Sequence, residues 1–417
     1  MRSTSSARLG GHRRASATAG PASARAGRPG RRVRPASVAA LLAAVLLAAG
    51  CSSTSANAGG AATSDPMAGM SMTPTMPAEL PPAATPTSVN VYSHDGANAL
   101  SPNVAGQRPL VYVPNSDSNS VDVIDPATFK VIDHFVTGKN PQHVVPAWDL
   151  RTLYVTNDLA NSLTPIDPTT GRAKGPNIPV DDPYNMYFTP DGKYAIVVAE
   201  ARERLDFYDT QTWKLVRQVR VDCPGVDHID YSADESFLVA TCEFSGKLVK
   251  IDWRNFQVLG YLTIGGMPQD IKLDPQGEVF YVADMQSNGV HLIDAKTFTK
   301  IGFIPTGKGA HGLYPSRDAK VLYVSNRGEG SISLIDFATR RIVGRWQIPG
   351  GGSPDMGGVS ADGSVLWLSG RYNREVYAIS TTDGHLLARI PVGAGPHGMS
   401  VWPQPGRYSL GHTGILR

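Results

Sequence analysis

Short runs of β-branched and aromatic residues, each ending at a polar turn residue, recur along the chain. Residues 153–157 read Leu-Tyr-Val-Thr-Asn, and variants of this run occupy residues 111–115, 280–284 and 322–326. Runs of this composition predict short β-strands. Because the same run returns several times, the sequence first indicates a propeller or a solenoid built from repeats.

The repeat has a nearly constant length. A turn residue precedes each run at intervals of 42, 43, 42, 42, 44 and 42 residues, at Asp149, Asp191, Asp234, Gln276, Asp318, Asp362 and Gln404. An Asp ends the predicted third strand of six units, at Asp125, Asp167, Asp209, Asp252, Asp294 and Asp336. In five units a Thr follows three residues later, a spacing at which the Asp side chain closes a turn on nearby backbone. These Asp residues are therefore predicted to be structural.

A unit of about 42 residues with four short strands has the size of one propeller blade. We therefore predict an all-β fold, a seven-bladed β-propeller over residues 109–404 with four antiparallel strands in each blade. The repeat opens on a second strand, 110–115, and closes on a first strand, 397–403. One blade is thus predicted to be shared between the two ends of the chain, which leaves no exposed sheet edge where the ring closes.

The chain resembles the YVTN-type β-propeller repeat proteins. The matching motifs are residues 153–157 and 322–326, the Pro-Asp-Gly turn at 190–192 and the Pro-His-Gly at 396–398. The resemblance covers about 300 residues and implies an architecture similar to the haem-d1 propeller of nitrite reductases and the heavy chain of methylamine dehydrogenase. It implies a fold more than an activity, because one propeller scaffold carries many unrelated functions.

The first 50 residues predict export. They contain nine Arg and no Asp or Glu, and the apolar run 38–49 leads to Leu-Ala-Ala-Gly-Cys at 47–51. This pattern indicates a signal peptide over 1–50 with a lipobox, so that Cys51 carries the lipid and anchors the protein on the outer face of the cytoplasmic membrane. The alternative is ordinary secretion, with Cys51 a chance thiol. The leader's Arg pairs leave general and twin-arginine export both open.

Removing the leader changes the charge of the chain. Without its nine Arg the formal net charge falls from +3 to −6. The basic balance therefore belongs to the leader, and nucleic acid is not an indicated partner. The expected partners are the membrane, through the lipid, and a protein or small molecule at the propeller, which we expect to be a monomeric domain.

Residues 51–87 predict a flexible Ser-, Thr-, Ala- and Pro-rich tether. Four thioethers lie within ten of its residues, at Met67, Met70, Met72 and Met76. Methionine sulfur is a soft ligand suited to Cu(I), so copper capture is one interpretation of this run. An inert linker is the other.

Two segments lie outside the repeat. A lead-in spans 88–108 and a C-terminal tail spans 405–417. Because the ends of a closed ring lie close together, we expect these segments to meet and to cap one end of the channel.

The predicted channel mouth collects polar residues. The innermost strands would start at His143, Tyr184 with Asn185, His228, Gln269 with Asp270, His311, Asp355 with Met356, and His397. The second strands would end on the same face at Asp158, Glu200, Glu243, Asp284, Arg327 and Arg371. The side chains of His143, His228, Asp270, His311, Asp355 and His397 are our candidates for a ligand or metal, with Asn185, Glu200, Glu243, Asp284, Arg327 and Arg371 lining the mouth.

Each of these imidazoles also has a structural interpretation, in which it only bonds a neighbouring blade. The functional interpretation rests on the cluster, because neutral imidazoles with a carboxylate suit copper or zinc. Opposite blades are expected to be too far apart for one ion at about 2.0 to 2.2 Å from each ligand. A larger ligand, or a site between adjacent blades, is the alternative. Strand starts at the rim are expected to be partly solvated.

Cys223 and Cys242 are the remaining cysteines. Both are predicted on the mouth side, Cys223 at the end of an outer strand and Cys242 at the end of a second strand. We expect a disulfide, since an exported protein meets an oxidising compartment. Free thiols, or metal ligands beside His228 and Glu243, are the alternatives.

No nucleophile-elbow serine, phosphate loop, zinc-protease helix motif or haem-attachment motif is present. We therefore interpret the chain as a lipoprotein whose propeller works mainly as a binding or accessory module. The rival class is an extracytoplasmic enzyme or cofactor protein that uses the same mouth. It would be either a metal-dependent hydrolase similar to lactonase propellers or a protein that holds a haem-type tetrapyrrole on a channel His.

Overall fold

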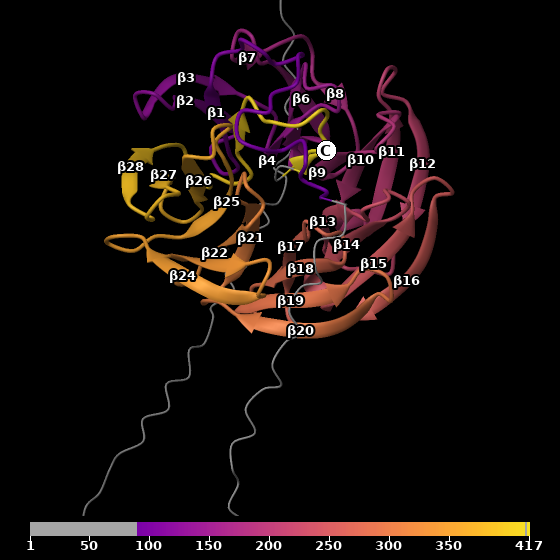
Figure 1. The fold of residues 1–417 in the computed structure, drawn as a ribbon. Coiled ribbons are helices and arrows are strands. Elements are labelled where there is room, and N and C mark those ends of the chain that lie inside the picture. Colours follow the sequence, from indigo (N-terminus) through magenta and orange to yellow (C-terminus); the bar gives the residue numbers. More distant parts are fainter. Residues whose placement is uncertain (1–89, 413–414) are drawn as a thin grey trace, which may run out of the picture. The chain divides into compact units, whose positions relative to one another are not determined.

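The computed structural model describes residues 90–412 and 415–417. Cys51, the Met-rich run and the predicted boundaries at residues 50 and 87 lie outside them. The described residues form seven antiparallel sheets around a central channel, with the inner strands near the centre and the outer strands at the periphery (Figure 1). Among these residues the helices are three short 3-10 turns, η1 (Asp158–Ala160), η2 (Glu200–Arg202) and η3 (Glu243–Ser245), and no helix could span a membrane.

Six blades follow one another along the chain, each running from its inner to its outer strand. Blade 1 contains β4 (Pro141–Pro146), β5 (Leu153–Asn157), β6 (Ser162–Asp167) and an outer strand in two pieces, β7 (Arg172–Ala173) and β8 (Ile178–Pro179). Blade 2 contains β9 (Pro183–Phe188), β10 (Tyr194–Ala199), β11 (Arg204–Asp209) and β12 (Leu215–Arg220). Blade 3 contains β13 (Val226–Tyr231), β14 (Leu238–Cys242), β15 (Lys247–Asp252) and β16 (Gln257–Thr263).

The next three blades repeat this order. Blade 4 contains β17 (Pro268–Leu273), β18 (Val279–Asp284), β19 (Gly289–Asp294) and β20 (Thr299–Pro305). Blade 5 contains β21 (Ala310–Pro315), β22 (Val321–Asn326), β23 (Ser331–Asp336) and β24 (Arg341–Gln347). Blade 6 contains β25 (Pro354–Val359), β26 (Val365–Gly370), β27 (Glu375–Ser380) and β28 (Leu386–Pro391).

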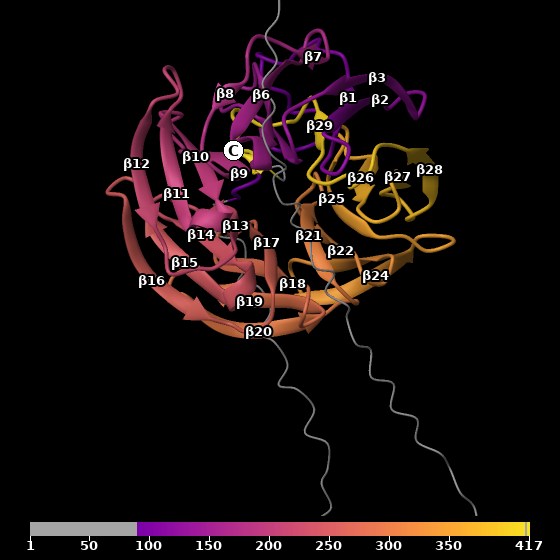
Figure 2. The same ribbon diagram turned by 180° about the vertical axis from the view of Figure 1, so that it is seen from behind.

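Blade 7 joins the two ends of the propeller. It contains β29 (Ser400–Trp402), β1 (Leu110–Asn115), β2 (Ser120–Asp125) and β3 (Lys130–Val136) in that order. β29 pairs antiparallel with β1, with Leu110 opposite Trp402 and Tyr112 opposite Ser400, and the two strands lie side by side in Figure 2. The seven-bladed ring closed by a shared blade is therefore confirmed.

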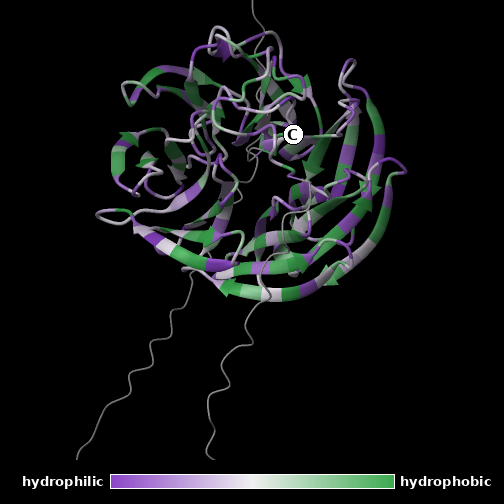
Figure 3. Ribbon diagram, in the orientation of Figure 1, coloured by the Kyte–Doolittle hydropathy of each residue, from purple (hydrophilic) through white to green (hydrophobic). Residues whose placement is uncertain are grey.

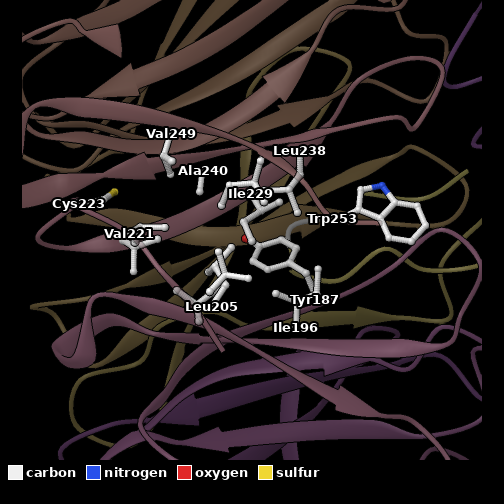
Figure 4. Close-up of a cluster of buried hydrophobic side chains, with 14 of the residues drawn as sticks. Tyr187, Ile196, Leu205, Val221, Cys223, Ile229, Leu238, Ala240, Val249 and Trp253 are labelled. Atoms are coloured by element: carbon white, nitrogen blue, oxygen red, sulfur yellow. The ribbon is translucent and has the colours of Figure 1, made fainter. Parts of the chain in front are cut away.

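The core lies between neighbouring blades. Hydrophobic and hydrophilic residues are mixed along the strands (Figure 3), yet β1, β18 and β4 are buried along their whole length because blades pack on both faces of them. Outer strands are half exposed, as in the alternating pattern of β16. Figure 4 shows Tyr187 and Leu205 of blade 2 against Ile229 and Leu238 of blade 3. Burying such side chains contributes roughly 1.5–3 kcal/mol each, so each blade is stabilised by its neighbours.

The final Asn of the repeated run clamps its own blade. Asn157 Nδ2 donates to Thr164 Oγ1 at 2.9 Å, and Asn326 Nδ2 donates to Ser333 Oγ at 3.0 Å, so each amide holds the start of the third strand. The backbone before the next inner strand approaches the same side chain closely. A Cβ on Gly138 would lie 2.7 Å from Asn157 Cβ, which explains why glycine stands there. The Asn of the motif therefore has a structural role.

The Asp residues that end the third strands close turns, as predicted. Asp294 Oδ1 accepts hydrogen bonds from Thr297 N at 2.7 Å and Thr297 Oγ1 at 2.9 Å. The following Phe298 has a φ of 53°, a left-handed conformation that the side-chain bonds help to hold. Asp336 and Thr339 repeat the pattern.

The lead-in and the tail meet on the face opposite the mouth. Gly406 N donates to Ala99 O at 3.0 Å, and the tail then crosses the channel, where Phe188 N donates to Leu410 O at 2.9 Å. The C-terminal end lies near the centre of the ring (Figure 1). Arg417 Nη2 lies 3.3 Å from the buried Asp230 Oδ1. The tail therefore closes this end of the channel, beside a small cavity of about 30 Å³ that has room for about one water.

Deletion of residues 395–417 should destabilise the whole ring, because it exposes the edge of β1 and removes the buried Trp402. Loss of a buried Trp side chain alone costs roughly 3–5 kcal/mol. Deletion of residues 406–417 keeps β29 and should lower the melting temperature less. Equal melting of the intact chain and the longer deletion would contradict the closure.

Candidate functional site

The inner strands of six blades are irregular where they begin. In blade 1, Pro141 pairs with Asn157 and Val144 with Val155, so two residues of β4 face one residue of β5. The same register shift occurs in blades 3, 4, 5 and 6 and, one residue along, in blade 2. Such bulges re-aim side chains. They carry residues 142–143, 184, 227–228, 269–270, 311–312 and 355–356, and thus most of the predicted site.

A hydroxyl of the second strand fixes four of these bulges. Each hydroxyl accepts a hydrogen bond of 2.8–3.2 Å from a backbone N–H group of the bulge. The pairs are His143 N with Thr156, His228 N with Thr241, Gly312 N with Ser325, and Met356 N with Ser369. Two of them also donate to the next blade, Thr156 to Tyr184 O at 3.1 Å and Ser325 to Asp355 O at 2.9 Å. The Thr of the repeated motif therefore orients the site residues and joins the blades.

Three candidate ligands from adjacent blades converge. His311 of blade 5, Asp355 of blade 6 and His397 of blade 7 each offer one ligand atom, and these atoms lie within 4.8 Å of one another. His311 Nδ1 is 3.1 Å from Asp355 Oδ1, and His397 Nε2 is 3.6 Å from Asp355 Oδ2. The sulfur of Met356 lies 3.1 Å from His311 Nδ1. We name these four residues the His–Asp–Met cluster.

The other two candidate imidazoles belong to blades 1 and 3. The His143 ring is 4.8 Å from the His397 ring and 5.6 Å from the His228 ring, measured between centroids. Neither ring nitrogen of His143 has a hydrogen-bond partner among the described residues. His228 Nδ1 contacts Asn185 Nδ2 at 3.2 Å and Tyr187 Oη at 3.1 Å. His228 is therefore held in the wall of the channel, whereas His143 Nδ1 packs directly against Gly398, where an added Cβ would lie 1.9 Å away.

Three of the predicted residues serve the scaffold. Asn185 Oδ1 accepts from Met186 N at 2.8 Å, and Asp270 accepts from Ile271 N and from Leu313 N of the next blade, both at 2.9 Å. Asp270 also pairs with Lys272 at 3.2 Å. Asp284 takes the position of the motif Asn and bonds His291 Nε2 at 3.0 Å. Burial opposes ionisation of Asp284, but bonds from His291, Ser287 and Met267 outweigh it and lower its pKa.

The sequence led us to expect partly solvated imidazoles, and this prediction is wrong. His143 and His228 are fully buried, and His311 and His397 are 2–3% exposed, because the bulges turn them inward under the rim loops. Burial, with nearby positive charge, lowers the pKa of His143, His311 and His397 well below the usual value, and lowers that of His228 to about 3. Neutral imidazoles keep nitrogen lone pairs for a ligand.

The loops after the second strands divide the rim by charge. Blades 1, 2 and 3 place Asp158, Glu200 and Glu243 directly after their second strands. Burial, followed by the charges of Glu243, Asp158 and Asp182, raises the pKa of Glu200 to about 8. Burial and the charge of Asp182 raise the pKa of Asp158 to about 6. Glu200 therefore keeps its proton at neutral pH unless a cation takes its place.

Blades 5 and 6 place Arg327 and Arg371 at the corresponding positions. Arg327 Nη1 lies 3.1 Å from Asp355 Oδ1, and the guanidinium lies 5.5 Å from the Tyr372 ring. Among the residues that the structure describes, the Arg371 side chain donates only to neutral oxygens, Ser116 Oγ at 2.7 Å and Gly395 O at 3.1 Å. The rim is thus acidic over three blades and basic over two.

Sequence reasoning missed two contributors. Asp227 is fully buried beside His228, and its pKa is raised well above the usual value by burial and by Glu243, Glu200 and Asp270. A two-residue bulge would have placed it at the mouth, but the repeat spacing predicts a strand start and not a bulge. His412 of the tail enters the channel, its ring 4.2 Å from that of His143. It lies outside the repeat, so no periodic signal identifies it.

Cys223 and Cys242 form a disulfide, with their Cα atoms 5.2 Å apart. Cys223 lies in the loop after β12 rather than at the end of that strand, which stops at Arg220. The disulfide joins this loop to the end of β14, directly before Glu243. Because both sulfur atoms are bonded to each other, neither cysteine offers a thiolate to a metal.

The fold and the mouth together define a seven-bladed β-propeller with a polar, largely buried site at one end of its channel. The chain belongs to the YNCE-like beta-propeller family, whose sequence profile matches residues 76–405. No curated protein sequence matches the chain.

Several solved structures share the fold. Hydrazine synthase of Kuenenia stuttgartiensis is 20% identical with a TM-score of 0.58, covering 72% of this chain and 98% of that one. The dihydro-heme d1 dehydrogenase NirN is 15% identical with a TM-score of 0.55, covering 76% and 83%. A putative 6-phosphogluconolactonase from Bacteroides uniformis is 18% identical with a TM-score of 0.58, covering 70% and 99%. Similarity at this level establishes the fold alone, including its likeness to a haem-d1 propeller.

The raised pKa of Glu200 predicts a pH dependence of stability. The folded chain keeps the Glu200 proton up to about pH 8, whereas the unfolded chain releases it near its ordinary value, so the free energy of unfolding should fall as pH rises between these values. E200Q removes this titration and should flatten the decline by at least about 1 kcal/mol. Urea unfolding at several pH values measures it. E203Q, in the same loop but exposed, is the control; equal slopes for wild type and E200Q would contradict the prediction.

Proposed function

We propose that this protein is a membrane-anchored, extracytoplasmic propeller that binds copper, as Cu(I), at the His–Asp–Met cluster. The observation that carries the proposal is the convergence of two neutral imidazoles, a buried carboxylate and a thioether from three adjacent blades. Imidazole and thioether together are soft enough to prefer copper to harder cations.

The spacing of the donor atoms suits one ion. Donors about 2.0 to 2.2 Å from a tetrahedral ion lie roughly 3.3 to 3.6 Å from one another. Asp355 Oδ1 lies 3.1 Å from His311 Nδ1, and Asp355 Oδ2 lies 3.6 Å from His397 Nε2. With one donor atom taken from each of the three residues, all three lie within 4.8 Å of one another. Asp355 Oδ2 accepts no hydrogen bond from any described residue, so it is available as the carboxylate ligand.

The charge around the cluster favours a monovalent ion. Arg327 already compensates the carboxylate of Asp355 through its other oxygen at 3.1 Å. A divalent ion would leave two uncompensated positive charges in a buried site, whereas Cu(I) would leave one. The four methionines of the tether, Met67, Met70, Met72 and Met76, would supply additional Cu(I) ligands on the same chain.

Competition with a chromogenic Cu(I) chelator tests the proposal. The mature protein, with its four tether methionines changed to Leu, should bind one Cu(I). H311N/H397N should weaken binding by more than the roughly 10- to 100-fold typical of changes outside the ligand set. M356L should weaken Cu(I) binding and leave any Zn(II) binding unchanged.

The exposed His385 provides the control, since H385N should bind as wild type does. Melting curves for each variant separate lost binding from lost folding. Absence of Cu(I) binding in wild type, or unchanged binding in H311N/H397N, would refute the copper site. Tight haem binding by wild type would instead favour the tetrapyrrole function.

Anchoring is proposed from Cys51, next to the apolar run. The disulfide supports export, because disulfides persist in oxidising compartments. C51A should abolish lipid attachment, and the unprocessed precursor should accumulate at the membrane. Mass spectrometry and membrane fractionation measure this; an unchanged mature mass with retention at the membrane would require a different anchor.

A further inference from the structure

A cavity large enough for a small molecule lies between blades 1 and 2. Its volume is about 400 Å³, within the range of ligand pockets. It is formed by the β4–β5 turn of blade 1 and by the β9–β10 and β11–β12 turns of blade 2, which lie on the face opposite the mouth. Its lining includes four aromatic side chains and two carboxylates, namely Trp148, Tyr154, Phe188, Trp213, Asp149 and Asp191.

The aromatic walls of this cavity are preformed. Tyr154 and Trp213 come from neighbouring blades and are half-buried, with their ring centroids 5.1 Å apart and their planes at 66°. Trp148 stacks on Tyr408 of the tail, with the ring centroids 5.4 Å apart. Gly192 also packs against the Trp148 ring, since an added Cβ there would lie 2.5 Å from Cδ2. Trp148 is therefore held in place and does not fold into the cavity.

Each carboxylate keeps one oxygen that its own turn does not use. Asp149 Oδ1 accepts from Arg151 N at 3.0 Å, and Asp191 Oδ1 accepts from Lys193 N at 3.1 Å and from Thr189 Oγ1 at 2.6 Å. Within the part of the chain that the structure describes, the second oxygen of each carboxylate accepts no hydrogen bond, and neither carboxylate forms an ion pair. None of the residues that line the cavity is a Lys or an Arg. The lining is therefore negatively charged.

A cavity of similar size between blades 6 and 7 lacks these features. Its volume is about 390 Å³, and the two tryptophans that line it, Trp367 and Trp402, are each only 1% exposed. Its carboxylate, Asp362, uses both oxygens in its turn, because Oδ1 accepts from Ser364 N at 3.0 Å and Oδ2 accepts from Ser364 Oγ at 2.8 Å. Of these two cavities, the one between blades 1 and 2 thus combines accessible rings with free carboxylate oxygens.

We propose that the cavity between blades 1 and 2 binds an organic cation with a quaternary ammonium group, of the choline type. The face of an aromatic ring attracts such a cation, which has no N–H group to donate. The free oxygens of Asp149 and Asp191 would supply the counter-charge. A cleft lined by one sign of charge concentrates the opposite ion, so the charge of the lining favours a cation over a neutral ligand such as a sugar. The site lies on the opposite face from the His–Asp–Met cluster and does not depend on copper.

One exposed ammonium group already contacts the wall of the cavity. Lys174 Nζ donates to Thr152 Oγ1 at 3.1 Å, and Thr152 lines the cavity. This contact shows that a cation is tolerated beside the lining, but its charge would repel a cationic ligand. K174Q should therefore raise the affinity for the ligand.

Calorimetry on the mature protein tests the proposal. The probes are choline, its neutral isostere in which a tert-butyl group replaces the trimethylammonium group, and methyl glucoside. Choline should bind at least about tenfold more tightly than the isostere, and W213L should lower its affinity by at least about tenfold. D149N/D191N should weaken choline binding and leave binding of the isostere unchanged, since Asn keeps the oxygen that accepts the turn hydrogen bonds.

The matched control is W346L. Trp346 is also half-buried and stacks on Tyr323 at 5.3 Å, but it does not line the cavity, so this variant should bind choline as wild type does. Melting curves separate lost binding from lost folding, and the exposed pair D149N/D191N decides the result if W213L does not fold. Absence of choline binding, equal binding of choline and its isostere, or tighter binding of the glucoside would overturn the proposal.

Discussion

The structure depends on one repeated hydrogen bond, from the backbone N–H of a bulged inner strand to a hydroxyl on the second strand. In blade 1 it runs from His143 N to Thr156 Oγ1 at 3.0 Å, and in blade 3 from His228 N to Thr241 Oγ1 at 3.0 Å. A bulge leaves a backbone N–H without its sheet partner, and burying that group unpaired would cost roughly 1–3 kcal/mol. The hydroxyl removes this cost and fixes the direction of the side chain next to it.

Where the second strand lacks a hydroxyl, another group meets the same need. The corresponding residues are Val198 in blade 2 and Ala283 in blade 4, and there Asn185 and Asp270 accept from the N–H of the residue that follows them. Two polar residues of the predicted site are thus explained by the scaffold. The rings of His143 and His228 do not serve the bulge in this way, because the hydroxyl accepts from their backbone N–H and not from the ring.

The sequence predicted the fold well because its signals are local and repeated. The Asp and Asn turn residues act within one blade, so their spacing specifies blade length, number and the shared closing blade. For the mouth, the sequence named candidate residues but not their burial or their neighbours. Burial of His311 and His397 depends on a register shift of one residue, which no alternation of polar and apolar residues reveals. The choice of Asp355 as their neighbour depends on which blades are adjacent, and His412 arrives from a tail without a repeat.

The repeated backbone also explains how an asymmetric mouth arises from equivalent blades. Each blade offers the same bulge and the same position after its second strand, so function is determined by which side chain occupies each one. Arg327 connects the two parts of the mouth: it pairs with Asp355 at 3.1 Å, and after the bond from Gln269 its charge offsets part of the burial that raises the pKa of Glu243. A positive ion held by Asp355 Oδ2 in the His–Asp–Met cluster would share the carboxylate charge with Arg327, which pairs with Oδ1. The guanidinium would then act more strongly on the rim, which links occupation of the channel to the charge that a ligand at the mouth encounters.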